Sequence, residues 1–528
     1  MPELPDHPHL DHLKKQAKQL LRDYRAGSPG ALERLRAGLP AAAGRDDDEL
    51  RRLSLRLRDA QSCVAREYGF ASWAQLRAHV EALPGRGAGP DVVVHRWLRL
   101  VYAGDVTGGN QAARPDVAAR WLAEQPALAA TVARDPHLSC AVGDDTAVGR
   151  AIATDAGWPA RPGGPLGLPP LVAVTQSALL RLPAFADGVR ACARLLVDAG
   201  ASPDQTFVTA DGHRLSALHG AAGANHDPEL TRLLLVAGAG PDDGESLYHS
   251  LDNPACTRLL LEAGARITGT NAIYRVFDLD DAGTLRLLLD HGADPNEPSP
   301  TWGTPLLFAI RRRRSAEHVR ALLAAGADPR ARTPDGVGAY RLALRFGLPE
   351  VAELLHAAGA VEPVDIPEML VAACAAGQAE VAHRLLAQHP GIVGALTPSQ
   401  LRLLPDRAAA GGPGSGDAVR LMVTAGWPVD VSGGDWDASA LNHAVFRGDA
   451  GLTRFLLEHG ADWTTRHGYD DTVVGTLSWA SLNGDGDGDW AGCAEALLDH
   501  GMPAPRPEDG YEFSDDVAEV LIPDPAPK

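Results

Sequence analysis

Side chains that could carry out chemistry gather in one stretch of the chain, between residues 245 and 278. Glu245, His249, Asn271 and Asp278 stand there. A carboxylate and an imidazole are common partners in general acid–base catalysis, and both side chains are metal ligands. If these groups shared one pocket, the chain would be an enzyme or a small-molecule binder. We keep this reading as the alternative hypothesis.

The motifs of the common enzyme classes are absent from the sequence. A phosphate-binding P-loop needs a lysine directly after a glycine. The four lysines are Lys14, Lys15, Lys18 and Lys528, and none of them follows a glycine. Neither HExxH nor GxSxG occurs. We therefore predict a chain that is not an enzyme and that needs no cofactor.

One acidic run resembles the first half of a calcium-binding loop. It begins at Asn483 and continues through Asp485, Asp487 and Asp489 in alternation with glycine. Such a loop needs a bidentate glutamate at its twelfth position, and that position is Ala494. The run is therefore interpreted as a polar insertion, and no metal site is predicted.

Large aromatic side chains and one basic run stand in segments that we expect to be loops. The aromatic residues are Phe207, Trp302, Trp436 and Tyr469. Aromatic residues on loops often anchor a partner, but they can also fold back over a neighbouring hairpin, and the sequence leaves both readings open. The basic run Arg311–Arg314 either complements the C-terminus of a helix or offers a basic spot to an acidic partner.

Composition and charge exclude several classes of protein. The 528 residues carry a net charge of −19, of which residues 1–83 contribute +2 and the remainder −21. Such an acidic body repels nucleic-acid phosphates and anionic lipids. The chain has no long apolar run and no signal peptide, and its six cysteines are scattered without a CxxC pair. We expect a cytoplasmic protein with no nucleic-acid and no membrane partner.

The first 83 residues predict a small bundle of four helices. Leucines recur at helical spacing in residues 10–25, and a second helix follows Gly27-Ser28-Pro29. An acidic start at Asp46–Glu49 leads into a third helix, through Leu50 and Val64. Ser72 can cap the last one. Residues 84–90, rich in glycine and proline, are predicted to be a linker.

Beyond residue 90 the chain repeats itself. A leucine pair followed by glycine and alanine recurs, with successive glycines separated by 26 to 41 residues, apart from one double gap of 67, a spacing near 33 residues for each unit. These glycines are Gly200, Gly238, Gly264, Gly292, Gly326, Gly359, Gly426, Gly460 and Gly501. Each leucine pair fits an amphipathic helix, such as the one expected to bury Leu323. The glycine fits the C′ position, where a left-handed backbone ends the helix. One such unit cannot bury its own apolar face, so stability must come from stacked neighbours.

These units resemble the ankyrin-repeat family. Thr304-Pro305-Leu306-Leu307 and Ser216-Ala217-Leu218-His219 are similar to its Thr-Pro-Leu-His motif. With its N-terminal segment Glu67–Trp73, the chain resembles bacterial ankyrin-repeat proteins, with about twelve repeats. The resemblance implies an all-α ankyrin-repeat solenoid of stacked helix pairs with short hairpins, preceded by a small helical bundle. It also implies structural roles for His219, His226 and His249.

The expected organisation follows from the bundle, the linker and the repeats. We expect a helical bundle at 1–83, a linker at 84–90, degenerate N-terminal repeats at 91–168, ankyrin repeats at 169–501 and a C-terminal cap or tail at 502–528. The resemblance implies a monomeric scaffold that binds a protein partner in its groove. The residues predicted to bind are Glu245, Asp278, Trp302, Arg311, Arg312, Trp436 and Tyr469.

Overall fold

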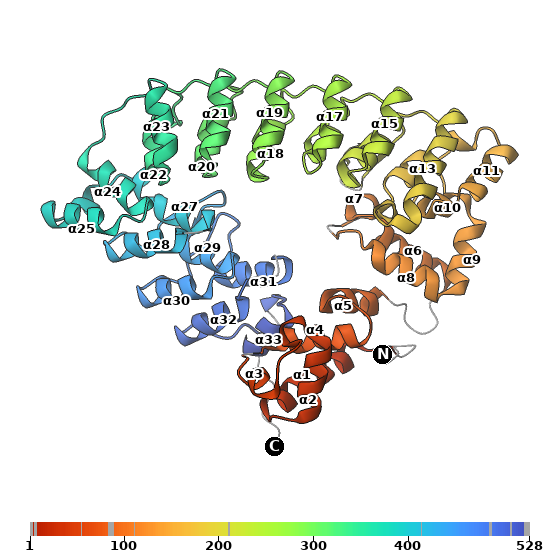
Figure 1. Cartoon of the computed structure of the whole chain (residues 1–528), viewed down its shortest axis with the longest axis horizontal. Helices are drawn as coiled ribbons and strands as arrows, with labels where there is room; N and C mark the ends of the chain where they lie inside the picture. Colours follow the sequence, from red (N-terminus) through yellow and green to blue (C-terminus); the bar gives the residue numbers. More distant parts are fainter. Residues whose placement is uncertain are drawn as a thin grey trace. The chain divides into compact units, whose positions relative to one another are not determined.

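The helices of this chain begin and end where the sequence supplies cap residues and glycines. The computed structural model describes Leu4 and residues 8–53, 55–82, 89–109, 111–209, 212–412, 414–484, 488–506 and 509–521 (Figure 1). The chain divides into two units, Met1–Ala272 and Ile273–Lys528. Within the described ranges, no helix combines the length and the apolar character needed to span a bilayer.

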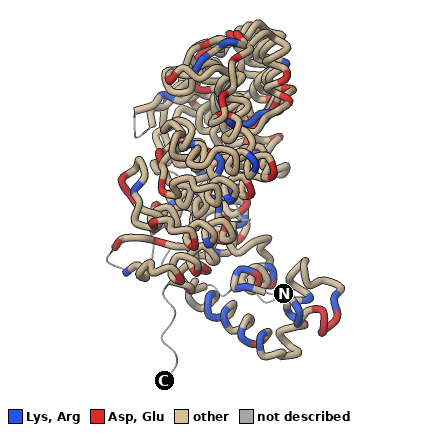
Figure 2. Tube along the Cα trace, turned by 90° about the vertical axis from the view of Figure 1, so that its left-hand side faces the viewer, with Lys and Arg blue, Asp and Glu red and all other residues tan. Residues whose placement is uncertain are grey.

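The first segment of unit 1 is a bundle of short helices, along which basic residues recur (Figure 2). Its elements are α1 (Leu10–Arg25), α2 (Pro29–Gly38), η1 (Pro40–Ala42), α3 (Asp47–Arg51), α4 (Leu57–Glu67) and α5 (Trp73–Ala82). The prediction of a single helix through Leu50 and Val64 is wrong, because α3 and α4 are separate. The backbone N–H of Arg56 donates to Asp59 (2.8 Å), and this cap starts α4 anew.

Helix pairs follow the bundle in unit 1. They are α6 (Pro90–Val101), α7 (Gly104–Thr107), α8 (Pro115–Glu124), α9 (Pro126–Arg134), α10 (Pro136–Val142), α11 (Asp145–Thr154), η2 (Trp158–Ala160), α12 (Pro170–Thr175), η3 (Ala178–Arg181), α13 (Pro183–Asp198), α14 (Ala217–His219), the π-helical turn η4 (Gly220–Ala224), α15 (Pro228–Val236), α16 (Ser246–Ser250) and α17 (Pro254–Glu262). Strands β1 (Thr206–Val208) and β2 (Arg214–Ser216) form an antiparallel hairpin that pairs Phe207 with Leu215.

Unit 2 continues the helix pairs. Its helices are α18 (Ala272–Asp278), α19 (Ala282–Asp290), α20 (Pro305–Arg311), α21 (Ala316–Ala324), α22 (Ala339–Arg345), α23 (Pro349–Ala357), α24 (Ile366–Ala375), α25 (Ala379–Gln388), η5 (Ile392–Ala395), α26 (Pro398–Leu401), α27 (Leu403–Ala410), α28 (Ser415–Thr424), α29 (Ala440–Phe446), α30 (Ala450–Glu458), α31 (Val473–Asn483), α32 (Trp490–Asp499) and α33 (Asp515–Leu521). The short hairpin β3 (Ser432–Gly433) and β4 (Ala438–Ser439) precedes α29. Figure 1 shows α18, α20 and α22 in one row and α19, α21 and α23 in a second row beside it.

Parts of several predicted segments lie outside the described residues. They include residues 84–88 of the predicted linker, residues 485–487 of the calcium-like run, and residues 507–508 and 522–528 of the predicted cap or tail.

The repeated glycines end their helices as the sequence predicts. All nine have positive φ values, between 86° and 100°. After α21, the N–H of Gly326 donates to the carbonyl of Leu323 (3.1 Å), and the N–H of Ala327 donates to the carbonyl of Leu322 (2.9 Å). These bonds satisfy carbonyl groups that the end of the helix would leave unpaired. The C′ role of the glycines is confirmed.

The regular alternation of helices is interrupted between α25 and α28. Gly391 follows α25 with a φ of 84°, and the 3₁₀ turn η5 comes next. Thr397 then starts the short helix α26 with a capping box to Gln400, and Pro398 occupies its first turn. Two successive helices, α26 and α27, therefore stand where the other units have one first helix.

Leu322, and not Leu323, is the core leucine of α21. Leu322 has no exposed surface, whereas Leu323 is only half-buried, so the predicted register was off by one residue. We expect Leu322→Ala to lower the free energy of unfolding by about 2–5 kcal/mol, because it loses transfer free energy and leaves a cavity. Leu323→Ala is the matched control and should cost clearly less. Denaturant unfolding of the two variants measures the difference, and equal losses would contradict this assignment of the core.

Candidate functional site

Five of the predicted binding residues line one pocket in unit 2. The pocket has a volume of about 440 Å³. Its lining includes Asp278, Trp302, Arg311, Arg312 and Trp436, from the ends of α18 and α20, the loop before α20 and the β3–β4 hairpin. Helices α27 and α29 complete the wall. We call it the Arg312 pocket. The structure brings these five side chains together from positions up to 158 residues apart.

Arg312 joins two walls of this pocket. Its Nε donates to Asp278 (2.7 Å) and its Nη1 donates to Asp435 (2.8 Å), which is 123 residues away in the sequence. The guanidinium carbon also lies 4.6 Å from the centre of the Phe308 ring. Burial alone would lower the pKa of Arg312, but the two carboxylates outweigh it and raise the pKa. Arg312 is therefore a permanently charged bridge between α20 and the hairpin.

The other arginines of the basic run are also engaged within the chain. Arg314 pairs with Asp280 (2.7 Å), and Arg313 donates to the carbonyl of Phe346 (3.2 Å). Arg313 has a φ of 55° in the turn that follows α20. Arg311 is exposed and lines the pocket. Two of the four arginines, Arg312 and Arg314, are thus neutralised by carboxylates of the chain, which weakens the interpretation of this run as a basic spot for an acidic partner.

The β3–β4 hairpin is held in position by α27 and α29. Asp406 of α27 accepts a hydrogen bond from the N–H of Gly434 (2.8 Å), and burial raises the pKa of its carboxyl group. His443 of α29 contacts the carbonyl of Gly433 through Nε2 (3.2 Å). Burial lowers the pKa of His443 to about 4, so its ring is neutral at pH 7. The ring of Trp436 packs against that of His443, with centroids 4.7 Å apart.

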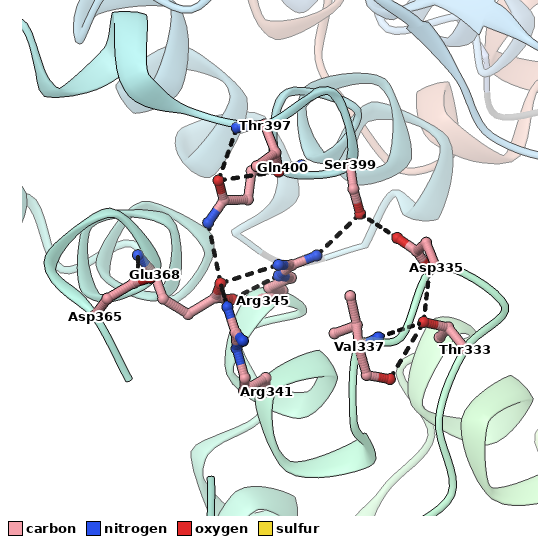
Figure 3. Close-up of polar contacts among 10 residues, drawn as sticks. All are labelled: Thr333, Asp335, Val337, Arg341, Arg345, Asp365, Glu368, Thr397, Ser399 and Gln400. Atoms are coloured by element: carbon pink, nitrogen blue, oxygen red, sulfur yellow. Dashed lines mark hydrogen bonds and ion pairs between the residues drawn. The ribbon is translucent and has the colours of Figure 1, made fainter. Parts of the chain in front are cut away.

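A buried polar network fixes the start of the α26–α27 segment (Figure 3). Glu368 of α24 has no exposed surface and accepts hydrogen bonds from Arg345 (2.5 and 3.0 Å), Arg341 (2.8 Å) and Gln400 (3.0 Å). Arg345 also donates to Ser399 (3.0 Å), so the network ties α22 and α24 to α26. Because α26 leads directly into α27, the network indirectly sets the position of Asp406 and of the hairpin.

This network extends to the hairpin before α22. Ser399 donates to Asp335 (2.7 Å), which also accepts a bond from the hydroxyl of Thr333 (2.6 Å). None of these residues was predicted from the sequence to be a positioning group. The sequence pattern that could have drawn attention to Glu368 is its spacing from Asp365, which is typical of a helix start. Asp365 does cap α24, but the Glu368 side chain bonds to the two arginines and Gln400.

A second pocket shares Trp436 and Phe446 with the first one. It measures about 570 Å³ and is lined by Trp436, Phe446, His467, Tyr469, Asp471, Gly475, Thr476 and Trp479. We call it the Trp479 pocket. Tyr469, predicted from the sequence, is 79% exposed here. Phe446 and Trp479 were missed, because they stand within helices α29 and α31, where an aromatic residue usually indicates a core position. Their rings stack with centroids 5.4 Å apart and are 40% and 54% exposed.

Trp302 is an anchor within the fold as well as a pocket residue. Its ring packs against those of Tyr274 and Phe308, at centroid distances of 5.4 and 5.0 Å, and it is only half-buried. Phe207, in strand β1, is also partly buried. Of the four loop aromatics, Tyr469 alone is largely exposed.

Glu245, the remaining predicted binding residue, lies in unit 1. It precedes α16, and its carboxylate is 3.4 Å from His249. The His249 ring packs against that of His219 (5.2 Å), whose pKa burial lowers to about 4. His226 contacts the carbonyl of Ala222 (3.1 Å). Over the described ranges, no group of three or more histidine, cysteine or acidic residues is arranged to hold a metal ion.

The comparisons with known proteins concern the fold. No family model matches the chain, and no curated protein matches it either. Among solved structures, it is similar to the ankyrin repeat domain of human ASB11 (19% identity, 44% of this chain, 99% of that chain, TM-score 0.22). It is also similar to the ankyrin repeat domain of Bcl-3 (22% identity, 44% of this chain, 92% of that chain, TM-score 0.22). The helix pairs, hairpins and terminal glycines described above confirm the predicted all-α, ankyrin-type fold.

Proposed function

We propose that the chain is a non-enzymatic scaffold that binds a segment of a partner protein over the Arg312 and Trp479 pockets. We also propose that it is a bacterial, cytoplasmic and monomeric ankyrin-repeat protein of about twelve repeats. The observation that supports the binding site most strongly is that the two pockets share part of their wall. Trp436 lines both pockets, so one extended segment could occupy both of them.

The chemistry of the surface supports a protein ligand. Phe446, Tyr469 and Trp479 are large apolar side chains with 40%, 79% and 54% of their surface exposed. Exposed aromatic residues that gather in one place often carry most of the binding energy of an interface. The bridge formed by Arg312, Asp278 and Asp435 is already satisfied within the chain and adds rigidity beside these rings. A surface fixed before binding loses less conformational entropy when it binds.

Affinity capture with a combined variant tests the proposal. The full-length chain is immobilised and exposed to lysate of the native host, as wild type and with Trp302, Trp436, Arg311 and Arg312 all changed to alanine. We expect the wild type to retain a defined protein that the variant does not retain. A control variant carries Val208→Ala and Val236→Ala, which remove exposed apolar side chains of unit 1 (61% and 83% exposed).

The control variant should capture the same protein as the wild type. Mass spectrometry identifies the retained proteins, and circular dichroism verifies that both variants are folded. If the combined variant captures the same proteins as the wild type, the two pockets are not the binding site.

A further inference from the structure

We propose that the Trp479 pocket binds the guanidinium group of an arginine side chain in a basic segment of the partner. This inference rests on the proposed function and specifies the chemistry of its ligand.

Aromatic rings form most of the pocket wall. The ring of Trp436 lies 5.7 Å from that of Phe446 and 4.9 Å from that of His467, and Phe446 in turn stacks on Trp479. Tyr469 stands beside His467, with ring centroids 6.0 Å apart. A cation held over the face of such rings is attracted by their negative π-faces, most strongly by tryptophan.

Among the described lining residues, Asp471 supplies a carboxylate of which one oxygen accepts no hydrogen bond. Asp471 Oδ1 accepts hydrogen bonds from the hydroxyl of Tyr511 (2.8 Å) and from the N–H of Thr472 (2.7 Å). Over the described residues, Oδ2 receives no hydrogen bond. A Cβ atom on Gly475 would lie 2.0 Å from Oδ2, so glycine at this position leaves the space that the carboxylate oxygen occupies. A ligand that bonds to Oδ2 would therefore displace no hydrogen bond from a described residue.

The charge of the lining favours a cation. Among the described residues, Asp471 is the only acidic one that lines the pocket, and no lysine or arginine does so. Burial lowers the pKa of His467, against the smaller opposite effect of Asp471, so the imidazole is neutral at pH 7. Arg466, nearby in the sequence, is paired with Asp470 (2.9 Å). Outside its first 83 residues the chain carries a net charge of −21, which attracts a basic segment at long range.

Arginine fits this combination better than an apolar side chain. An apolar side chain would cover Asp471 without pairing it, and burying an unpaired carboxylate is costly. A guanidinium can stack on an aromatic face and donate in its plane to a carboxylate. The chain uses the same arrangement internally, since Arg312 lies over Phe308 while it donates to Asp278 and Asp435.

Matched peptides test the inference on the full-length chain. The probes are acetyl-Gly-Ser-X-Ser-Gly-amide, where X is arginine, its uncharged analogue citrulline, or leucine. Binding is measured by tryptophan fluorescence and by calorimetry. We expect the arginine peptide to bind at least ten-fold more tightly than the other two, and its affinity to fall as salt is added.

Three variants assign the binding to this pocket. Asp471→Asn should weaken arginine binding at least five-fold, and it retains an oxygen that can accept the bonds from Tyr511 and Thr472. Trp479→Ala should abolish saturable binding. Leu482→Ala, on the same helix α31, removes an exposed side chain outside the pocket lining and should change nothing. If Trp479→Ala does not fold, Asp471→Asn decides the question.

Equal affinity for the three peptides, no saturable binding of the arginine peptide, or an Asp471→Asn variant that binds it unchanged would overturn the inference. Its failure is distinguishable from failure of the proposed function. If the combined alanine variant loses the captured protein while the arginine peptide does not bind, only the chemistry of the ligand is wrong. If the arginine peptide binds as expected while capture is unaffected by the combined variant, the extended binding site is wrong.

Discussion

Glu368→Gln is expected to lower the free energy of unfolding of unit 2 by about 3–5 kcal/mol, because it removes one partner of a buried ionic network. Arg345 is only 5% exposed and would keep its charge without a carboxylate to pair with. Glutamine has nearly the same shape as glutamate, so the loss reports the charge and its hydrogen bonds more than the volume. Urea denaturation followed by circular dichroism measures it.

An exposed ion pair of the same unit provides the control. Glu350 pairs with Arg320 at 2.8 Å, and its side chain is 69% exposed. Glu350→Gln should therefore change the free energy of unfolding by only about 0–1 kcal/mol. If the Glu368 and Glu350 variants lose the same stability, the buried network does not hold α24 and α26 together.

The effect of Glu368→Gln should depend on pH. Burial alone would raise the pKa of Glu368, but the hydrogen bonds from Arg345 and Arg341 outweigh it, so the pKa lies below its ordinary value of 4.5. A carboxyl group whose pKa is lower in the folded state stabilises the fold above the unfolded-state pKa, and this contribution is lost as the pH falls through the folded-state pKa. The difference between wild type and variant should thus be full at pH 7 and shrink below pH 4.5.

Trp436→Ala is expected to weaken binding of the captured partner by about 2 kcal/mol or more, roughly 30-fold, because Trp436 lines both pockets and anchors of this kind dominate interfaces. Arg311→Ala should cost only about 0–1 kcal/mol, since an exposed charge at the rim contributes little. Calorimetry with the purified partner measures both variants.

A conservative variant separates binding from folding at this position. Trp436 also packs against His443 and His467, so its removal could disturb the hairpin. Trp436→Phe keeps an aromatic ring and should recover much of the affinity. If Trp436→Ala binds the partner as tightly as the wild type does, the shared wall is not the centre of the interface.

Features that depend on neighbours in the sequence were predicted from the sequence alone. The C′ role of glycines such as Gly326 depends on a backbone conformation within one helix end. The helix start predicted at Asp46–Glu49 is confirmed, because the Asp46 side chain accepts a hydrogen bond from the N–H of Glu49, three residues away. The period of the leucine pairs predicted stacked helix pairs, because each helix pair must bury its apolar face against a neighbouring helix pair. The prediction of one helix through Leu50 and Val64 was wrong, because a second helix cap at Arg56 divides it into α3 and α4.

The tertiary structure decided which side chains meet. Five of the predicted residues line one pocket because α26 and α27 bring the β3–β4 hairpin to the end of α20. Arg312 and Asp435 are 123 residues apart, and no local pattern indicates that they pair. Glu368 occupies a position in α24 that would be exposed on an isolated helix, but the packing of α22 and α26 buries it. A helix cap or a C′ glycine depends on a few adjacent residues, whereas a pocket depends on the stacking of several units, and that stacking exists only in the folded chain.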